Sequence, residues 1–264
     1  MILSSQHQFH ECVSFNEERQ FVAAYKGLNL RSVYQPIFDH KNHPIGVEAL
    51  VRIEDQQQKN VRPDLFFHSN EISLEDKINV ERLSRAIHIR NFSNSKYRHL
   101  NLFLNVLPSD GEFFALENMR VGQLSEGLKS LNLQPNQVVM EVVELDSPDE
   151  QCLKNAMAIL EANGYKIAID DFGMHASNRD RVELIKPSII KIDRSLLLDY
   201  MQGITAPMLS GIELAKKVKA KVVVEGIETK EQYLAMRALD VDFFQGYFLA
   251  TPQALTATEA TEVG

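Results

Sequence analysis

The 264-residue sequence has few of the features that mark several common classes of protein. It contains only two cysteines, Cys12 and Cys152, which argues against a disulfide framework and against a cysteine-ligated zinc site. No stretch approaches the roughly 18 apolar residues of a membrane-spanning helix, and the N-terminus lacks the basic and apolar regions of a signal peptide. We therefore expect a cytoplasmic protein with no membrane span.

The chain also lacks an excess of positive charge and an internal linker. Its formal net charge of −8 disfavours a role in coating a nucleic-acid polymer. A small phosphorylated ligand stays compatible with this charge, because local groups or metal ions can reverse its sign inside a cleft. No Pro-, Gly- or Ser-rich segment divides the sequence, and its length fits one barrel domain of roughly 250 residues.

What the sequence does contain is an alternation of helical and extended patterns. We expect an amphipathic helix at residues 15–27, another at 75–92, and further helices between the later strands. Eight segments are typical of strands: 32–39, 44–53, 99–107, 137–145, 165–170, 187–193, 220–226 and 241–248. A short polar turn joins the first two into an antiparallel hairpin, and the later alternation indicates a parallel sheet. These patterns predict an α/β fold, a closed (β/α)8-type barrel with an irregular first hairpin.

Polar side chains lie at or near the ends of most of these strands. They are Glu48, Asn105, Glu141, Asp170, Asp171, Lys191, Glu225 and Gln245. Because the C-terminal ends of parallel barrel strands surround one mouth, where the active sites of such barrels lie, we expect these eight side chains to share one cleft.

The chemistry of this set predicts a metal site. Five of its members offer carboxylate or amide oxygens: Glu48, Asn105, Glu141, Asp170 and Asp171. Without a cation the carboxylates would repel one another, and oxygen ligands without His or Cys favour Mg²⁺ or Mn²⁺. The adjacent Asp170 and Asp171 allow one carboxylate to bridge two ions, and paired ions about 3.5–4 Å apart suit hydrolysis of a phosphodiester. Lys191 would hold the nucleophile or the charge that builds on phosphate.

Each residue taken alone also has a purely structural explanation. Asp171 could cap a helix or form a turn, and Lys191 could be a solvated surface lysine. Glu225 could begin a helix, Asn105 could bind a loop backbone, and His175 fits an ordinary loop residue. The joint pattern, rather than any one position, favours a functional site.

Seven blocks of the sequence resemble, in order, those of the EAL-domain phosphodiesterases of cyclic di-GMP. They are "VEALVRI" (47–53), "FLNVLPS" (103–109), "MEVVE" (140–144), "IDDFG" (169–173), "IIKIDRSLL" (189–197), "VVVEGIET" (222–229) and "FFQGYFLATP" (243–252). The resemblance implies a TIM-like (β/α)8 barrel with one antiparallel strand, in a domain at residues 21–254 with an N-terminal segment (1–20) and a C-terminal tail (255–264). It also implies hydrolysis of cyclic di-GMP to linear pGpG with two Mg²⁺ or Mn²⁺ ions, which lowers this messenger in motility and biofilm signalling.

Carried over position by position, the resemblance implies a role for each residue of the site. The first ion would be held by Glu48, Asn105, Glu141 and Asp170. Asp170 would bridge to a second ion, which Asp171 would hold and Glu225 would support through water. Lys191 would orient the attacking water and Gln245 would lie behind the water network, so that the catalytic residues are Glu48, Lys191, Glu225 and Gln245. Of the remaining residues, Gln35 and Leu50 would line the ligand pocket. Arg52 would contact a substrate phosphate, and Glu144 would anchor the loop after Asp171.

That loop departs from the family pattern. Family members usually carry "DDFGTG" followed by an aromatic residue and two serines, whereas residues 170–178 read "DDFGMHASN", with Met174 and His175 at the usual Thr and Gly. In this family the loop is linked to metal binding and to the dimer interface. An alternative is therefore a weakly catalytic cyclic di-GMP-binding effector or a protein-interaction module. We expect a homodimer, regulated by expression, oligomerisation or a protein partner.

Overall fold

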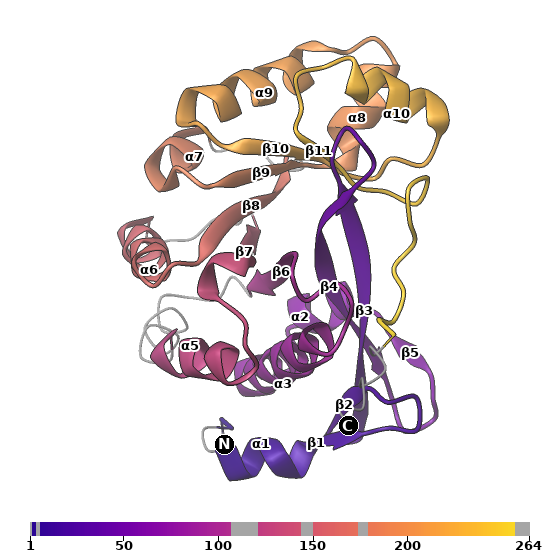
Figure 1. Cartoon of the computed structure of the whole chain (residues 1–264), viewed down its shortest axis with the longest axis vertical. Coiled ribbons are helices and arrows are strands. Elements are labelled where there is room, and N and C mark those ends of the chain that lie inside the picture. Colours follow the sequence, from indigo (N-terminus) through magenta and orange to yellow (C-terminus); the bar gives the residue numbers. More distant parts are fainter. Residues whose placement is uncertain (1, 4–5, 107–120, 144–149, 174–178, 257–264) are drawn as a thin grey trace, which may run out of the picture. The chain divides into compact units, whose positions relative to one another are not determined.

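The computed structural model describes residues 2–3, 6–106, 121–143, 150–173 and 179–256, in two compact units (Figure 1). The first unit comprises Met1–Tyr34, Ala49–His99 and Pro252–Gly264. The second comprises Gln35–Glu48 and Leu100–Thr251. Two long strands, β3 (Leu28–Phe38) and β4 (Pro44–Glu54), contribute residues to both units.

The second unit contains a closed ring of strands. Its other strands are β6 (Asn101–Val106), β7 (Val138–Val143), β8 (Lys166–Phe172), β9 (Ile189–Ile192), β10 (Lys221–Val224) and β11 (Phe243–Phe244). The order β3-β11-β10-β9-β8-β7-β6-β4 closes through the pairing of β3 with β4. Neighbouring strands from β6 to β11 run parallel, while β3 runs antiparallel to β11. The predicted TIM-like barrel with one antiparallel strand is therefore confirmed.

Helices cover the outside of this ring (Figure 1). Apolar side chains fill its inside. The described helices are α5 (Val121–Ser130), the 3₁₀ helix η1 (Pro135–Gln137), α6 (Glu150–Ala162), α7 (Arg179–Ile185), α8 (Arg194–Met201), α9 (Ala206–Val218) and α10 (Lys230–Arg237). The interior layer consists of one buried residue from each of six strands: Ile37, Phe103, Val139, Ala168, Ile189 and Val223. This interior layer closes the middle of the barrel and leaves the C-terminal ends of the strands available for a site.

The first unit combines short antiparallel strands with helices. Its elements are α1 (Gln6–Cys12), β1 (Val13–Phe15), β2 (Phe21–Tyr25), the first part of β3, the last part of β4, β5 (Asn60–Val61), α2 (Pro63–His68) and α3 (Leu74–Ser93). Its core includes Leu30 and Ile53 from the sheet, packed with Leu83 and Ile87 of α3. The helix predicted at 75–92 is confirmed as α3.

The helix predicted at residues 15–27 is wrong, because this segment forms a β-hairpin. Residues Phe21, Ala23 and Tyr25 follow the two-residue period of β2, which pairs antiparallel with both β1 and β3. Lys26 and Gly27 form the two-residue turn to β3, with φ angles of 47° and 81°. Two consecutive positive φ angles define the turn that joins tight hairpins, so the short turn chemistry overrides the apparent helical periodicity.

The last predicted strand, at residues 241–248, is much shorter than expected. Only Phe243–Phe244 forms β11. Beyond it, Gln245 continues the backbone pairing, since its N–H donates to Val224 O at 2.9 Å and its O accepts from Ile227 N at 3.1 Å. A Cβ at Gly246 would lie 2.1 Å from the carbonyl oxygen of Ile227. The chain therefore leaves the strand here by a close backbone approach that only glycine allows.

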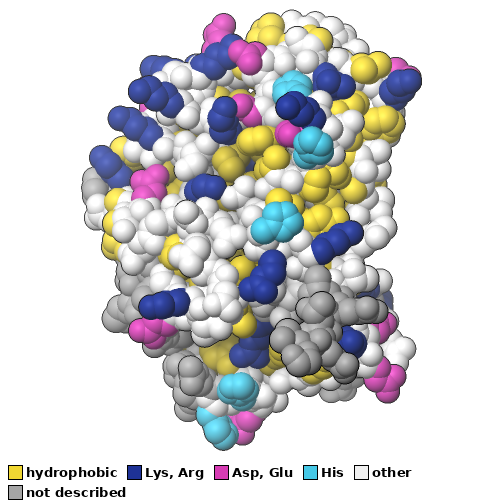
Figure 2. All heavy atoms as spheres, in the orientation of Figure 1, with side chains coloured by type: hydrophobic (Ala, Val, Ile, Leu, Met, Phe, Trp, Pro, Cys, Tyr) yellow, Lys and Arg dark blue, Asp and Glu magenta, His cyan; other side chains and the backbone are white. Residues whose placement is uncertain are grey.

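The surface of the second unit carries mixed charge. In the region of α7 and α9, Figure 2 shows Lys and Arg side chains interspersed with Asp and Glu. Ion pairs of this region include Lys216–Asp240 at 2.8 Å and, between α9 and α7, Lys217–Glu183 at 2.7 Å. Among the described residues, no helix is both long and apolar enough to cross a membrane.

Candidate functional site

The polar residues that the sequence places at strand ends converge at the C-terminal end of the barrel strands. Their elements are β4 for Glu48, β6 for Asn105, β7 for Glu141, β8 for Asp170 and Asp171, and β9 for Lys191, while Glu225 and Gln245 directly follow β10 and β11. All eight belong to the second unit. The register of the parallel strands places these residues at the same height in the barrel; Asn105 of β6, for example, lies opposite Glu141 of β7.

Lys191 lies at the centre of this cluster. Its side chain is 1% exposed, and its Nζ lies 2.6 Å from Glu141 Oε1, 2.8 Å from Glu225 Oε1, 2.9 Å from Asp170 Oδ1 and 3.4 Å from Glu48 Oε2. An ammonium group has three N–H donors, so it cannot donate to all four carboxylates at once. The alternative of a solvated surface lysine is excluded by this burial.

A β-bulge explains why two adjacent aspartates both face the site. In a regular strand, neighbouring side chains point to opposite faces. In β8 the pairing with β9 runs Ile169↔Ile190 and then Phe172↔Ile192, so Asp170 and Asp171 together oppose the single residue Lys191. Asp171 has a φ of 54°, a left-handed conformation that Asp tolerates better than most residues. The bulge thus turns the second carboxylate back toward the first.

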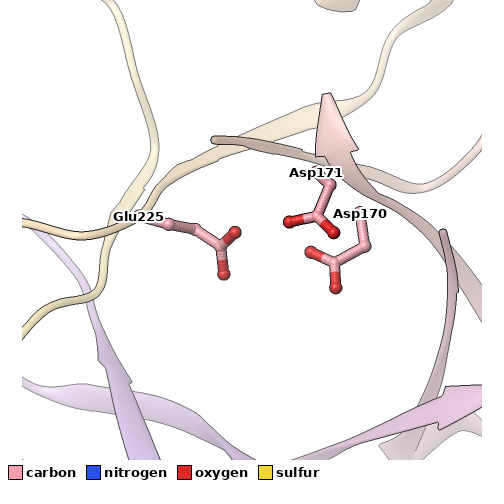
Figure 3. Close-up of side chains that lie close together, drawn as sticks. All are labelled: Asp170, Asp171 and Glu225. Carbon is pink, nitrogen blue, oxygen red and sulfur yellow. The ribbon is translucent and has the colours of Figure 1, made fainter. Parts of the chain in front are cut away.

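Three carboxyl groups meet as a result. One oxygen each from Asp170, Asp171 and Glu225 lie within 4.8 Å of one another, and Figure 3 shows these groups directed toward each other inside the ring of strands. In the part of the chain that the structure describes, this is the group of His, Cys, Asp and Glu side chains that could hold a metal ion. Its ligands are oxygen atoms, as Mg²⁺ and Mn²⁺ prefer.

The site has fewer positive charges than carboxyl groups, and the pKa shifts of its residues reflect this. Burial raises the pKa of Glu141 and of Glu225 well above the usual range, although the charge of Lys191 opposes both shifts. Burial, reinforced by the charge of Asp170, raises the pKa of Asp171 to about 6. Burial alone would lower the pKa of Lys191, but the carboxylates around it, Asp170 foremost, raise it well above its ordinary value. One ammonium group faces five carboxyl groups.

Hydrogen bonding points to the same deficit. Glu141 Oε2 and Gln245 Oε1 are buried and accept no hydrogen bond among the described residues. Glu141 Oε1 and Asp170 Oδ1 are also buried, and they face Lys191 Nζ at 2.6 and 2.9 Å without good hydrogen-bond geometry. Buried oxygens without donors are costly, because they lose the water that would solvate them. Divalent cations would coordinate such oxygens directly, so the residues fit the metal ions that the sequence predicts.

Two amide side chains hold the position of Glu48. Gln245 donates from Nε2 to Glu48 Oε2 at 2.7 Å, and Asn105 donates from Nδ2 to Glu48 Oε1 at 3.4 Å. Glu48 and Gln245 are buried, whereas Asn105 is exposed. Gln245 therefore lies behind Glu48 and fixes its orientation.

The residues predicted to bind substrate belong to different units, and their role stays a prediction. Gln35 is buried in the second unit, where its Nε2 donates to Ala250 O at 3.1 Å. Leu50 and Arg52 belong to the first unit, are half-buried, and Arg52 Nη1 contacts Val51 O at 3.2 Å. Glu144 and the loop at 174–178 lie outside the described residues, so the roles expected of Glu144, Met174 and His175 stay predictions.

The rim of the mouth contains an ion pair that sequence reasoning missed. Arg194, at the start of α8, pairs with Glu228 in the segment after β10. The stem of Arg194 passes over Gly226, where a Cβ would lie 2.5 Å from Arg194 Cγ. This pair connects the chain segments that follow Lys191 and Glu225. The sequence signal was an arginine and a glutamate, each three residues after one of these site residues.

The fold and this cluster define a barrel protein with a group of buried carboxylates at its mouth, and one known family matches it. The EAL domain model matches residues 18–252. The chain belongs to the EAL domain family.

Relatives and solved structures agree with this assignment. The chain is 28% identical over 256 residues to the probable cyclic di-GMP phosphodiesterase PdeN of Escherichia coli (strain K12), covering 90% of this chain and 46% of PdeN. The Bacillus subtilis YkuI protein, solved with substrate c-di-GMP and calcium, matches with 26% identity and a TM-score of 0.74 over 87% of this chain and 56% of that one. Klebsiella pneumoniae BlrP1, solved as a manganese/cy-diGMP complex, matches with 26% identity and a TM-score of 0.70 over 85% and 56%. The chain spans about half the length, or less, of the curated relatives it matches first.

Proposed function

We propose that this chain hydrolyses cyclic di-GMP to linear pGpG with the help of two divalent cations, Mg²⁺ or Mn²⁺. The observation that carries the proposal is the convergence of four carboxyl groups around Lys191 at one end of the barrel, with a fifth, that of Asp171, beside Asp170 and Glu225. Membership of the EAL domain family supports the reaction, and the c-di-GMP in the YkuI and BlrP1 structures supports the substrate.

The residues of the mouth divide into two ligand sets. Glu48, Asn105, Glu141 and Asp170 would hold the first cation. Asp170 would be shared with a second cation, which Asp171 would bind and Glu225 would support. When bound, such a pair of cations lowers the pKa of the water it binds toward neutrality. It also neutralises charge on the attacking and leaving oxygens of a phosphodiester.

The remaining side chains would orient water and substrate. Lys191 keeps its proton on Nζ, because the surrounding carboxylates raise its pKa, and it can therefore donate to the attacking water and to the phosphate oxygens. Gln245 would keep Glu48 in place through its 2.7 Å hydrogen bond. Gln35, Leu50 and Arg52 would bind the substrate, with Arg52 on a phosphate, and Glu144 would anchor the loop at 174–178.

The biological setting follows from the substrate. A phosphodiesterase of this messenger lowers its concentration inside the bacterial cell, so we propose a cytoplasmic location and an output in motility or biofilm formation. A homodimer and an unidentified protein partner belong to the same proposal. The unusual loop residues Met174 and His175 favour a second candidate, a cyclic di-GMP-binding effector with little turnover.

One experiment tests the reaction. Purified protein is incubated with cyclic di-GMP and Mg²⁺ or Mn²⁺, and pGpG is measured by chromatography, with and without EDTA. We expect product only with the metal. Glu48→Ala removes a ligand and should lower kcat by several orders of magnitude, whereas the matched control Glu231→Gln, an exposed acid in the first turn of α10, should turn over like the unmodified protein.

The outcomes separate the candidates. Tight binding of cyclic di-GMP without product would replace the enzyme by the effector, and absence of binding would leave a protein-interaction module. Activity of Glu48→Ala close to that of Glu231→Gln would contradict the proposed ligand set.

A further inference from the structure

Helix α9 contains a glycine, Gly211, in its middle. Glycine is the least favourable residue in a helix interior after proline, so its presence there calls for a reason. A Cβ at Gly211 would lie 2.9 Å from Cε1 of Phe172 and 3.6 Å from Cδ1 of Ile192. The ring of Phe172 therefore occupies the space that any side chain at position 211 would need.

Phe172 is the residue that ends the bulge of β8. It is 3% exposed and pairs with Ile192, while Asp170 and Asp171 together oppose Lys191. Its ring lies on the outer face of the barrel against α9, whereas the two aspartates before it face inward. With Phe172 packed against α9, the position before it in the bulge is Asp171, whose carboxyl group points inward.

The backbone that carries the ring is held on its C-terminal side. The carbonyl of Phe172 accepts a hydrogen bond from Asp193 N at 3.1 Å. The next residue, Gly173, has a φ of 104°, and a Cβ there would lie 2.5 Å from Cδ1 of Leu196. The backbone after the bulge is therefore held against α8, so a shift of the ring is passed on to Asp171.

We propose that Gly211 is a positioning residue for Asp171: its missing side chain lets Phe172 seat against α9 and keeps the second carboxyl group of the bulge aimed into the barrel mouth. The inference rests on the proposed function, since it assigns to α9 a part in binding the second cation. An ordinary carbon contact of about 3.4 Å requires the ring to move by about 0.5 Å from its 2.9 Å position when alanine replaces Gly211.

The chain offers a matched control. Gly127 also lies within a helix, α5, but a Cβ there would meet nothing within 4 Å. Gly211→Ala and Gly127→Ala are the same chemical change, and both improve helix propensity. They differ in what the new methyl group touches, so a difference between them reports on Phe172.

The experiment measures Mn²⁺ binding to the substrate-free protein, from the electron paramagnetic resonance signal of free Mn²⁺, together with the thermal midpoint. We expect Gly211→Ala to lower the affinity for one of two Mn²⁺ ions about tenfold, the range found when partners of metal ligands are changed. Gly127→Ala should bind as the unmodified protein does. Phe172→Leu should lower the same affinity, and Gly211→Ala added to it should lower it no further.

Each result has a distinct meaning. Mn²⁺ binding by Gly211→Ala within twofold of Gly127→Ala would overturn the inference alone. Absence of Mn²⁺ binding by the unmodified protein would overturn the proposed function, and the inference with it. If Gly211→Ala does not fold, Phe172→Leu decides the matter, because an affinity unchanged by loss of the ring removes the basis of the positioning role.

Discussion

Replacing Lys191 by methionine tests whether this side chain balances the charge of the site. Methionine nearly keeps the volume and removes the ammonium group, which lies within 3.4 Å of four carboxylates at 1% exposure. Removing one partner of a buried ion pair costs roughly 3–5 kcal/mol. At roughly 2–4 °C per kcal/mol for a chain of this size, the metal-free Lys191→Met protein should melt about 6–20 °C lower.

The loss should depend on pH in a defined direction. Burial raises the pKa of Glu141 and Glu225 above the ordinary value of 4.5, so the folded protein holds these protons more tightly than the unfolded chain does. Their stabilising effect is present below pH 4.5 and is lost as the pH rises through the folded pKa values. Without Lys191 the pKa values of both glutamates rise further. The melting temperature of Lys191→Met should therefore fall less below that of the unmodified protein at about pH 5.5 than at about pH 8.5.

The assay is a set of thermal melts between these two pH values in EDTA, repeated with Mn²⁺. Lys154→Met, at an exposed position of α6, is the matched control. Added Mn²⁺ should narrow the difference between the two variants, because bound cations then balance the carboxylates that Lys191 balanced. Equal midpoints for the two metal-free variants across this pH range would refute the reasoning.

The other predictions concern stability. Burial lowers the pKa of His88 from 6.5 to about 3. The free energy of unfolding is therefore highest above pH 6.5 and falls by about 2 kcal/mol at pH 5, because the unfolded chain binds the proton there and the folded protein does not. His88→Gln should remove this pH dependence, as measured by urea unfolding. Gly46→Ala places a Cβ 2.7 Å from a ring carbon of Phe103 and should cost about 1–3 kcal/mol, whereas Gly127→Ala should not destabilise; equal effects would contradict this. Thr229→Ala removes the N-cap of α10 and should cost about 0.5–2 kcal/mol by the same measurement, and no loss would show that the cap is dispensable.

The barrel could be predicted because its strands are short apolar runs separated by helices. β8 and β10 are such runs, and their length and β-branched residues distinguish them from helices. Residues 15–27 lacked this distinction, since Phe21 and Tyr25, four residues apart, also fit one face of a helix over so short a span. Gly27 was the available signal in the sequence, because two-residue hairpin turns need positive φ angles, which glycine adopts readily; Lys26 and Gly27 have φ angles of 47° and 81°.

The members of the site could be predicted from residue type, but their geometry could not. Two adjacent aspartates in a regular strand would point to opposite faces, so the letters "DD" alone predict one carboxylate inside the barrel and one outside. The bulge that brings Asp171 inward depends on the position of Phe172, whose ring packs against α9 where Gly211 has no side chain. A contact between residues so distant in the chain leaves no local pattern. A glycine in a helix interior is therefore a useful place to look for the support of a site, since its cost in helix propensity indicates that something else needs the space.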